Sequence, residues 1–178
     1  MGRTATLRPT TDLSVSGFTT HSGRSGNSNV STNKYALISD TEPYDGATTY
    51  IAHLTEFTNN ASRTSTYITN YKLGFVDSSG KPVGKIRINN ITAVTTYVSC
   101  THENTSNRTN TTYFGISIDG SNYTYSSKYN NTGNSSNNFT TQNLTVSMPS
   151  STLGKVYDSI DDLDINLMVI TYQYTNRS

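Results

Sequence analysis

The sequence has no tryptophan, a single cysteine and few charged side chains. Because Cys100 has no second cysteine to pair with, the chain can form neither an internal disulfide nor a cysteine-based metal site. Charged residues make up 14% of the chain and nearly cancel to a net charge of +1, and no basic stripe is present that could follow a phosphate backbone. No stretch approaches the roughly 18 to 20 apolar residues of a membrane-spanning helix. We therefore expect neither nucleic acid nor a membrane as a partner.

Residues that carry chemistry are also scarce, and their spacing indicates no catalytic or metal site. The histidines, His21, His53 and His102, have no ligand partner at a metal-binding spacing. The sequence contains no nucleophile elbow and no EF-hand spacing. Seven of the 12 acidic residues lie in two clusters, Asp40, Glu42 and Asp45 in one and Asp158, Asp161, Asp162 and Asp164 in the other. We interpret both clusters as solvated turns rather than calcium sites, and we predict no catalytic residues, no cofactor and no metal.

Serine, threonine, asparagine and tyrosine are abundant, and stretches typical of strands alternate with polar turns. The 178 residues are enough for a single domain with a buried core. The sequence therefore predicts an all-β fold, an antiparallel, jelly-roll-like β-sandwich. We divide it into an N-terminal strand and long surface loop over residues 1–33, a candidate docking arm, and the β-sandwich domain over residues 34–178.

The longest predicted strand covers residues 84–100, GKIRINNITAVTTYVSC, with a register slip near Asn89 and Asn90. The last strand is predicted over residues 163–174. Because these two strands carry the best apolar faces, we expect them to be neighbours in one sheet. We expect burial to contribute about 1.5 to 3 kcal/mol for each of their core side chains, which are Ile86, Ile88, Val94, Val98, Leu167 and Val169. Cys100 ends the first of these strands, where a small buried apolar role is favoured over a reactive thiol.

The remaining elements follow from the same patterns. Alternation over residues 63–76 predicts a strand with Tyr67, Thr69, Tyr71 and Leu73 on one face. Pro9 has no N–H to donate, so a first strand over residues 3–8 is expected to end there. The other predicted strands cover residues 35–39, 48–57, 113–118, 123–126 and 139–148, with turns at 40–46, 77–80 and 119–120. Surface loops are predicted at residues 10–33, 101–111 and 128–138, and a single helical turn at 153–160.

Tyrosine is the informative excess, with 13 residues. Most of them fall on predicted strands, where tyrosine is an ordinary residue. Tyr123, Tyr125 and Tyr129 differ because they lie beside an asparagine-rich loop. Tyrosine is enriched at interfaces, since its ring is apolar and its hydroxyl tolerates water. These three residues are therefore the candidate contacts for a glycan or a protein partner, although a role as plain strand residues is favoured for them.

Four segments of the chain share features with one known family. Residues 4–10, TATLRPT, are similar to its opening strand, and residues 35–51 to its strand, acidic turn and TYI segment. Residues 84–91, GKIRINNI, are similar to its Gly-Lys-Ile-x-Ile core strand. Residues 155–167 are similar to its closing element, a hydrophobic turn followed by Asp-Leu and a strand. Through these segments the chain resembles the β-sandwich modules of virion and tail-associated proteins in bacteriophages of Firmicutes and gut bacteria.

The resemblance implies a non-enzymatic structural protein of the virion, a tail, head-fibre or capsid-decoration component. It implies many copies, as a homo-oligomer or on a symmetric lattice, with other virion proteins as partners. The N-terminus lacks the apolar run of a secretion signal, so we expect synthesis in the host cytoplasm and localisation in the virion. The alternative function is a carbohydrate- or receptor-binding module that contacts host surface glycans in adhesion. An enzyme such as a glycan depolymerase is the weakest alternative, because the chain supplies no convincing carboxylate pair.

Overall fold

The structure is a computed structural model in which strands make up most of the chain that it describes. The described residues are 3–16, 20–22, 28–29, 35–38, 52–53, 63–101, 108–133, 138–151 and 153–175. The strands in this part are β1 Leu7–Ser16, β2 Thr20–Ser22, β3 Ser28–Asn29, β4 Ala52–His53, β5 Arg63–Phe75, β6 Ile86–Arg87, β7 Thr92–Thr101, β8 Arg108–Ser117, β9 Tyr123–Tyr125, β10 Tyr129–Gly133, β11 Asn138–Ser147, β12 Val156–Tyr157 and β13 Asn166–Thr175. Its helical segments are short: α1 Tyr35–Ile38 and the 3-10 turns η1 Ser78–Gly80 and η2 Ile160–Asp162. Pairing between these strands is antiparallel throughout, and the all-β prediction is confirmed.

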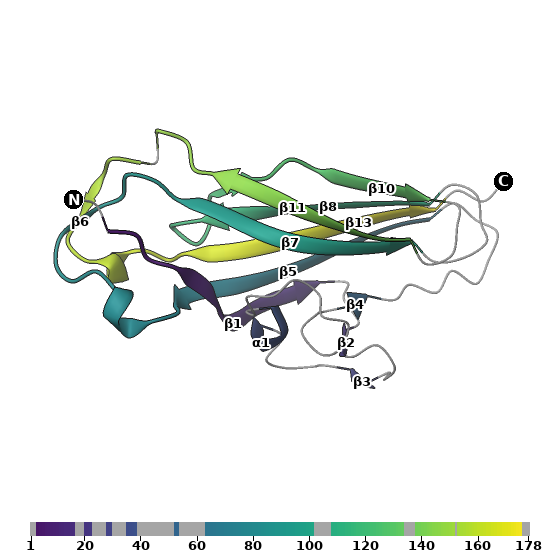
Figure 1. The fold of residues 1–178 in the computed structure, drawn as a ribbon, viewed down its shortest axis with the longest axis horizontal. Helices are drawn as coiled ribbons and strands as arrows, with labels where there is room; N and C mark the ends of the chain where they lie inside the picture. Colours follow the sequence, from purple (N-terminus) through teal and green to yellow (C-terminus); the bar gives the residue numbers. More distant parts are fainter. Residues whose placement is uncertain are drawn as a thin grey trace.

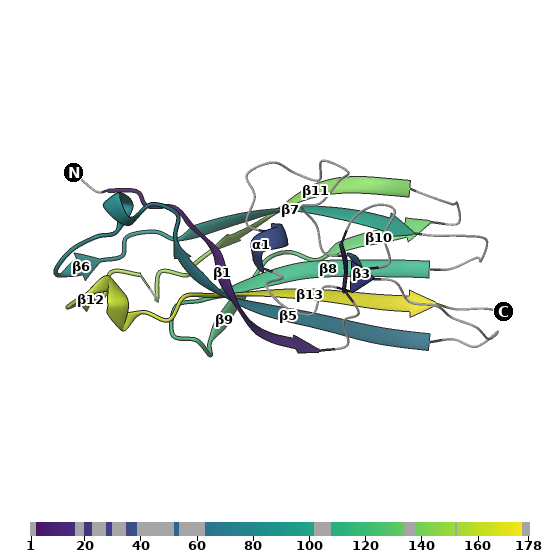
Figure 2. The same ribbon diagram turned by 90° about the horizontal axis from the view of Figure 1, so that it is seen from below.

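The largest sheet has the strand order β1–β5–β13–β8–β10 (Figures 1 and 2). β9 and β10 pair with successive parts of β8. Tyr125 of β9 lies opposite Gly115, and Tyr129 of β10 lies opposite Thr112. β13 is central and pairs without interruption with β5 on one side and β8 on the other. The long strands run along the long axis of the molecule, which places β6 and β12 near one end and the end of β13 at the other.

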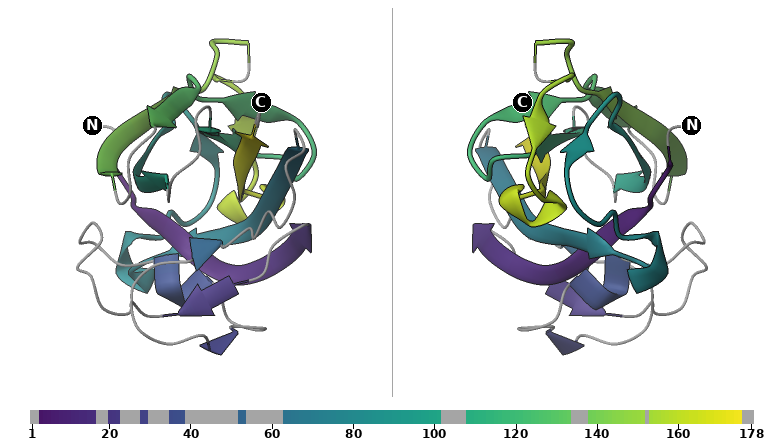
Figure 3. Two further views of the ribbon diagram at one scale, coloured as in Figure 1. Left: turned by 90° about the vertical axis from the view of Figure 1, so that its right-hand side faces the viewer. Right: turned by 90° about the vertical axis from the view of Figure 1, so that its left-hand side faces the viewer.

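β7 and β11 form a separate two-stranded sheet that packs against β8 and β10 (Figure 3). Alternate residues on β11 point inward, and so do alternate residues on β8, as the period of two in a strand requires. These side chains form the core cluster, and none of them is more than 6% exposed: Phe114, Ile116, Ile118, Leu144, Val146 and Met148. The core therefore lies where β8 and β11 face each other.

β5 confirms the predicted strand over residues 63–76 and its buried face. Tyr67, Thr69 and Tyr71 are buried, and Leu73 packs partly buried against the core cluster. After the strand, the side chain of Asp77 accepts the N–H of Ser79 and starts η1, which confirms the predicted turn there.

The predicted single strand over residues 84–100 is wrong. The structure has two strands there in different sheets, since β6 pairs with β12 and β7 with β11. Between them the backbone oxygen of Ile88 accepts the N–H of Gly154, outside either ladder. Asparagine favours turns over strand ladders, and Asn90 donates to the hydroxyl of Thr92 just before β7 begins. The expected register slip is thus a complete change of sheet.

The expected pairing of residues 84–100 with the last strand is also wrong, because β13 lies between β5 and β8. The burial of the expected core residues therefore differs from the prediction. Leu167 and Val169 pack partly buried against the core cluster, and Ile86 and Ile88 are only partly buried. The side chains of Val94, Val98 and Cys100 lie outside the description.

Two N-terminal predictions need correction. β1 does not end at Pro9 but continues to Ser16, and Pro9 is tolerated because β1 is an edge strand of its sheet. A register shift between Pro9 and Thr11 leaves Thr10 as an extra residue. Residues 35–38 form the helical turn α1 instead of a strand, and the N–H of Tyr35 at its start is bonded to a carboxylate oxygen of Asp12. A short apolar run fits either element, and this tertiary contact selects the turn.

Two further predictions need correction, and several lie outside the description. The predicted loop over residues 128–138 contains β10, which is held to β8 by its ladder and by a bond from Thr111 Oγ1 to Asn130 Oδ1. The predicted helical turn over 153–160 contains β12, and η2 begins only at its last residue. The turn at 40–46, most of the strand at 48–57 and residues 102–107 of the predicted hairpin loop are not among the described residues. The division at residue 33 stays a prediction; part of the first segment, β1, pairs with β5 of its own chain.

Candidate functional site

The main sheet carries a cluster of tyrosines on β9 and the adjoining part of β8. Tyr123 and Tyr125 alternate with Thr124, so their rings lie on one side of the strand, stacked with centroids 6.2 Å apart. Tyr113 on β8 meets Tyr125 edge-on at a centroid distance of 5.8 Å. The amino group of Lys128 lies 5.0 Å from the centroid of Tyr113, a cation–π distance. We call Tyr113, Tyr123, Tyr125 and Lys128 the tyrosine ledge.

The positions of the two β9 rings depend on neighbours in the sheet. Gly115 lies opposite Tyr125, and a Cβ atom at Gly115 would come within 2.8 Å of the Tyr125 ring. The missing side chain therefore provides the space in which this ring lies. The hydroxyl of Tyr123 accepts a hydrogen bond of 2.8 Å from Asn70 Nδ2 on β5. Tyr125 is still 49% exposed, which leaves an aromatic surface open to contact from outside.

Tyr129, the third predicted contact residue, is not part of the ledge. It lies opposite the buried Thr112 and packs against the core cluster, on the inner face of the sheet. The structure therefore brings Tyr123 and Tyr125 together and separates Tyr129 from them. Sequence reasoning missed Tyr113 and Lys128, although Tyr113 directly precedes the buried Phe114 and so faces the opposite side of its strand.

The turn that leads into β9 is fixed by Asp119. Its carboxylate accepts the side-chain and backbone N–H groups of Asn122, both at 2.7 Å, the N–H of Ser121 and the hydroxyl of Ser117. These bonds, with the side chain of Asn122 first, hold the pKa of Asp119 well below its usual range. Gly120 follows with a φ of 77°, which suits glycine. The turn sets where Tyr123 enters β9.

The second acidic cluster is engaged by lysines and by backbone groups. The ion pairs are Lys81–Asp161 at 2.7 Å, Lys85–Asp158 at 3.3 Å and Lys72–Asp164 at 3.7 Å. Asp162 accepts the N–H of Ser159, whose own hydroxyl accepts the N–H of Asp161, so together they cap η2. In the described parts of the chain, no three His, Cys, Asp or Glu side chains are placed to hold a metal ion.

The structure does not describe the side chains of the remaining sequence-derived candidates. His21 and His53 belong to the paired strands β2 and β4, and their side chains are not described. His102 and the first acidic cluster, Asp40, Glu42 and Asp45, lie outside the described residues.

Fold and ledge together define an all-β protein with an exposed aromatic surface on its main sheet. No protein-family model, curated protein or solved structure matches the chain. Within the described ranges, no helix is long and apolar enough to cross a membrane.

Proposed function

We propose that this protein is a non-enzymatic structural component of a bacteriophage virion, present in many copies as a tail, head-fibre or capsid-decoration protein. We propose further that its sheets form a jelly-roll-like β-sandwich, with the β7–β11 pair as part of the second layer. The face-to-face packing of β8 and β11 supports this arrangement. The functional proposal starts from the four-segment resemblance to phage virion modules, which names the class of protein.

The observation that carries the functional proposal is the tyrosine ledge. A cluster of tyrosine rings with Tyr125 exposed and Tyr113 and Tyr123 partly exposed suits a contact surface, because each ring can bury a large area while losing little conformational freedom. Two of the resembling segments also belong together in space, since β6 of residues 84–91 pairs with β12 of residues 155–167. This pairing supports reading them as parts of one structural unit.

The test is a mass measurement by light scattering followed by incubation with particles that lack the protein. We expect a defined oligomer that binds such particles stoichiometrically, and we expect Tyr125→Ala to weaken assembly at least tenfold. Tyr174→Ala, a similarly exposed tyrosine outside the ledge, is the matched control. A monomer with no affinity for particles, absent from mass spectra of intact virions, would overturn the proposal.

A second candidate function is glycan binding by the ledge. The stacked pair Tyr123 and Tyr125 favours it, since the apolar face of a sugar ring can lie on an exposed tyrosine ring. A glycan array separates the two functions. A reproducible hit that is lost in Tyr125→Ala and kept in Tyr174→Ala supports adhesion, whereas an empty array counts against it.

A further inference from the structure

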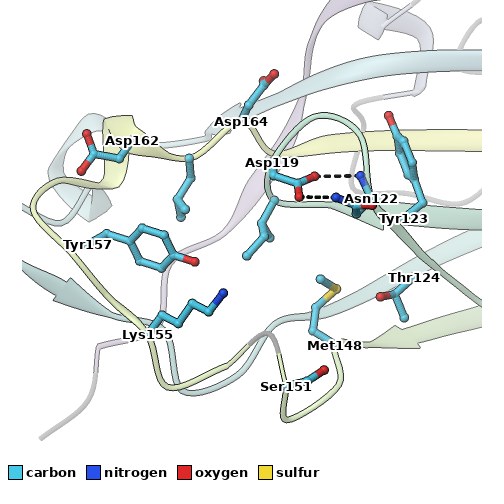
Figure 4. Close-up of a pocket in the computed structure, with 12 residues that line it drawn as sticks. Asp119, Asn122, Tyr123, Thr124, Met148, Ser151, Lys155, Tyr157, Asp162 and Asp164 are labelled. Carbon is cyan, nitrogen blue, oxygen red and sulfur yellow. Dashed lines mark hydrogen bonds between the residues drawn. The ribbon is translucent and has the colours of Figure 1, made fainter.

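The end of the molecule that carries β12 contains an open cleft of about 490 Å³ (Figure 4). The turn after β8, the chain after β11 and the segment from β12 to η2 form its walls. Ile118, Met148 and Leu163 give the cleft an apolar lining, and the first two are only 6% exposed. A space of this size accommodates a small organic molecule.

A cation and a phenol point into the cleft, whose lining also includes Thr124 and Ser151. Figure 4 shows the amino group of Lys155 and the ring of Tyr157 directed toward the middle of the cleft. At the same end of the molecule, Lys72, Lys81 and Lys85 each form an ion pair with an aspartate. Within the described part of the chain, Lys155 has no such carboxylate partner. Its charge is therefore available to a ligand.

The carboxylates around the cleft already take part in hydrogen bonds or in an ion pair. Asp119 accepts several hydrogen bonds within its own turn and faces Asn122. Asp164 pairs with Lys72, Asp162 caps η2, and both of these carboxylates point away from the cleft in Figure 4. A ligand would thus meet the Lys155 ammonium group and the Tyr157 hydroxyl, with Thr124 and Ser151 also in the lining, beside the apolar side chains.

We propose that this cleft binds a small carboxylate carried on a compact ring. The carboxylate would pair with the Lys155 ammonium and accept from the Tyr157 hydroxyl, a charge-assisted arrangement. The ring would lie against Ile118, Met148 and Leu163, which favour an apolar body or the apolar face of a sugar. An aromatic acid and an acidic sugar share this chemistry. The proposal stands independently of a virion role.

The first experiment titrates the whole protein with four probes and follows amide chemical shifts by NMR. Benzoate and glucuronate carry the carboxylate, and benzyl alcohol and glucose are their neutral counterparts. We expect saturable shifts at residues of the cleft for at least one acid, with a Kd of about 1 mM or tighter, and at least tenfold weaker binding of its neutral counterpart. Saturation by benzoate alone indicates an apolar acid, and by glucuronate alone an acidic sugar. Saturation by neither acid, or equal binding of the neutral probes, overturns the proposal.

Variants then test the assigned groups with the better acid. Lys155→Met keeps an apolar stem but removes the charge, and we expect it to weaken binding at least tenfold. Tyr157→Phe keeps the ring and should weaken binding a few-fold. Lys85→Met removes an ion-paired lysine outside the cleft and is the control, with unchanged affinity expected. Equal melting temperatures show that all variants fold, and undiminished binding by folded Lys155→Met contradicts the assignment.

Discussion

Asp119 is a surface residue whose carboxylate stabilises the turn that leads into β9. Asp119 is exposed, yet donors from Ser117, Ser121 and Asn122 surround its carboxylate and lower its pKa. An unfolded chain has no such donors, so its Asp119 has the ordinary aspartate pKa of about 3.9. The folded state therefore binds the proton less readily than the unfolded state does. The stability that the Asp119 carboxylate contributes is therefore present above about pH 4 and is lost as the pH falls toward its lower pKa in the folded state.

We predict that Asp119→Asn makes the stability of the protein less dependent on pH below about pH 4. The change removes the titrating group, whereas the wild type must protonate its carboxylate and lose the bonds from Asn122. Urea denaturation at pH 6, 4 and 3 measures the difference. Asp158→Asn, in an exposed ion pair with Lys85, is the control. An identical slope of stability against pH in Asp119→Asn and wild type would show that the turn does not depend on the charge.

Tyr71 gives a second pH dependence, at the alkaline end and of opposite sense. Burial raises its pKa to about 12, and the residue is 1% exposed. Tyrosine in an unfolded chain titrates near pH 10, so the unfolded state releases its proton first and stability falls as the pH rises from about 10 to 12. We predict that Tyr71→Phe reduces the fall between pH 9 and pH 11 by roughly 1.3 kcal/mol, because it removes the ionisable hydroxyl.

The measurement for Tyr71 is denaturation at pH 9 and pH 11. Tyr174→Phe changes an exposed tyrosine in the same sheet and controls for the general effect of high pH on the protein. The burial explanation requires a clear difference between the two variants. If they lose the same stability between the two pH values, the hydroxyl of Tyr71 is not protected from titration in the folded state.

At the scale of elements, β11 depends on its inward face. Leu144 is 6% exposed in the core cluster, while Thr145, the next residue on the strand, points outward and is exposed. We predict that Leu144→Ala lowers the free energy of unfolding by about 2 to 5 kcal/mol through lost burial and an unfilled cavity. Thr145→Ala should change it by less than about 0.5 kcal/mol. Similar losses in urea denaturation for the two variants would contradict the packing of β11 on β8.

Elements with strict alternation and a buried face are the ones that sequence reasoning locates well. β5 is the best example, because Tyr67, Thr69 and Tyr71 repeat at a period of two and are all buried. Sequence reasoning fails where a distant partner decides the structure. The bond between Asp12 and Tyr35 selects a helical turn, and the ladder to β8 makes a strand of the polar residues in β10. Neither partner is visible in a local pattern.

The tyrosine ledge shows the same limit for a candidate site. Proximity in sequence suggested Tyr123, Tyr125 and Tyr129 as a group, but the face of each side chain follows from strand register. Tyr129 starts a new strand opposite Thr112 and points inward, whereas Tyr113 and Tyr125 meet across β8 and β9. Pairing of β9 with β8 at Gly115 also creates the space for the Tyr125 ring. Register of this kind is a tertiary property.

At the scale of the whole molecule, the N-terminal segment can either dock on a neighbouring subunit or belong to the sheet of its own chain. As a docking arm it would bind a neighbouring subunit, and its removal would abolish assembly without affecting the fold. In the structure, Leu7 pairs with Phe75 and Pro9 with Leu73, and the oxygen of Thr6 accepts the N–H of Val76. This segment therefore covers an edge of β5 in its own chain. Without it, β5 would present an unpaired edge along the start of that ladder.

We predict that deletion of residues 1–10 lowers the free energy of unfolding by roughly 2 to 3 kcal/mol, at about 0.5 to 1.5 kcal/mol for each lost backbone bond. For a protein of this size the melting temperature should fall by roughly 5 to 10 °C. Deletion of residues 1–3, which precede the β1 ladder, is the control and should leave the melting temperature unchanged. Thermal denaturation and light scattering on the same samples separate the two architectures. An unchanged melting temperature combined with a loss of oligomers would assign the segment to a neighbour, whereas a lower melting temperature with oligomers retained assigns it to its own sheet.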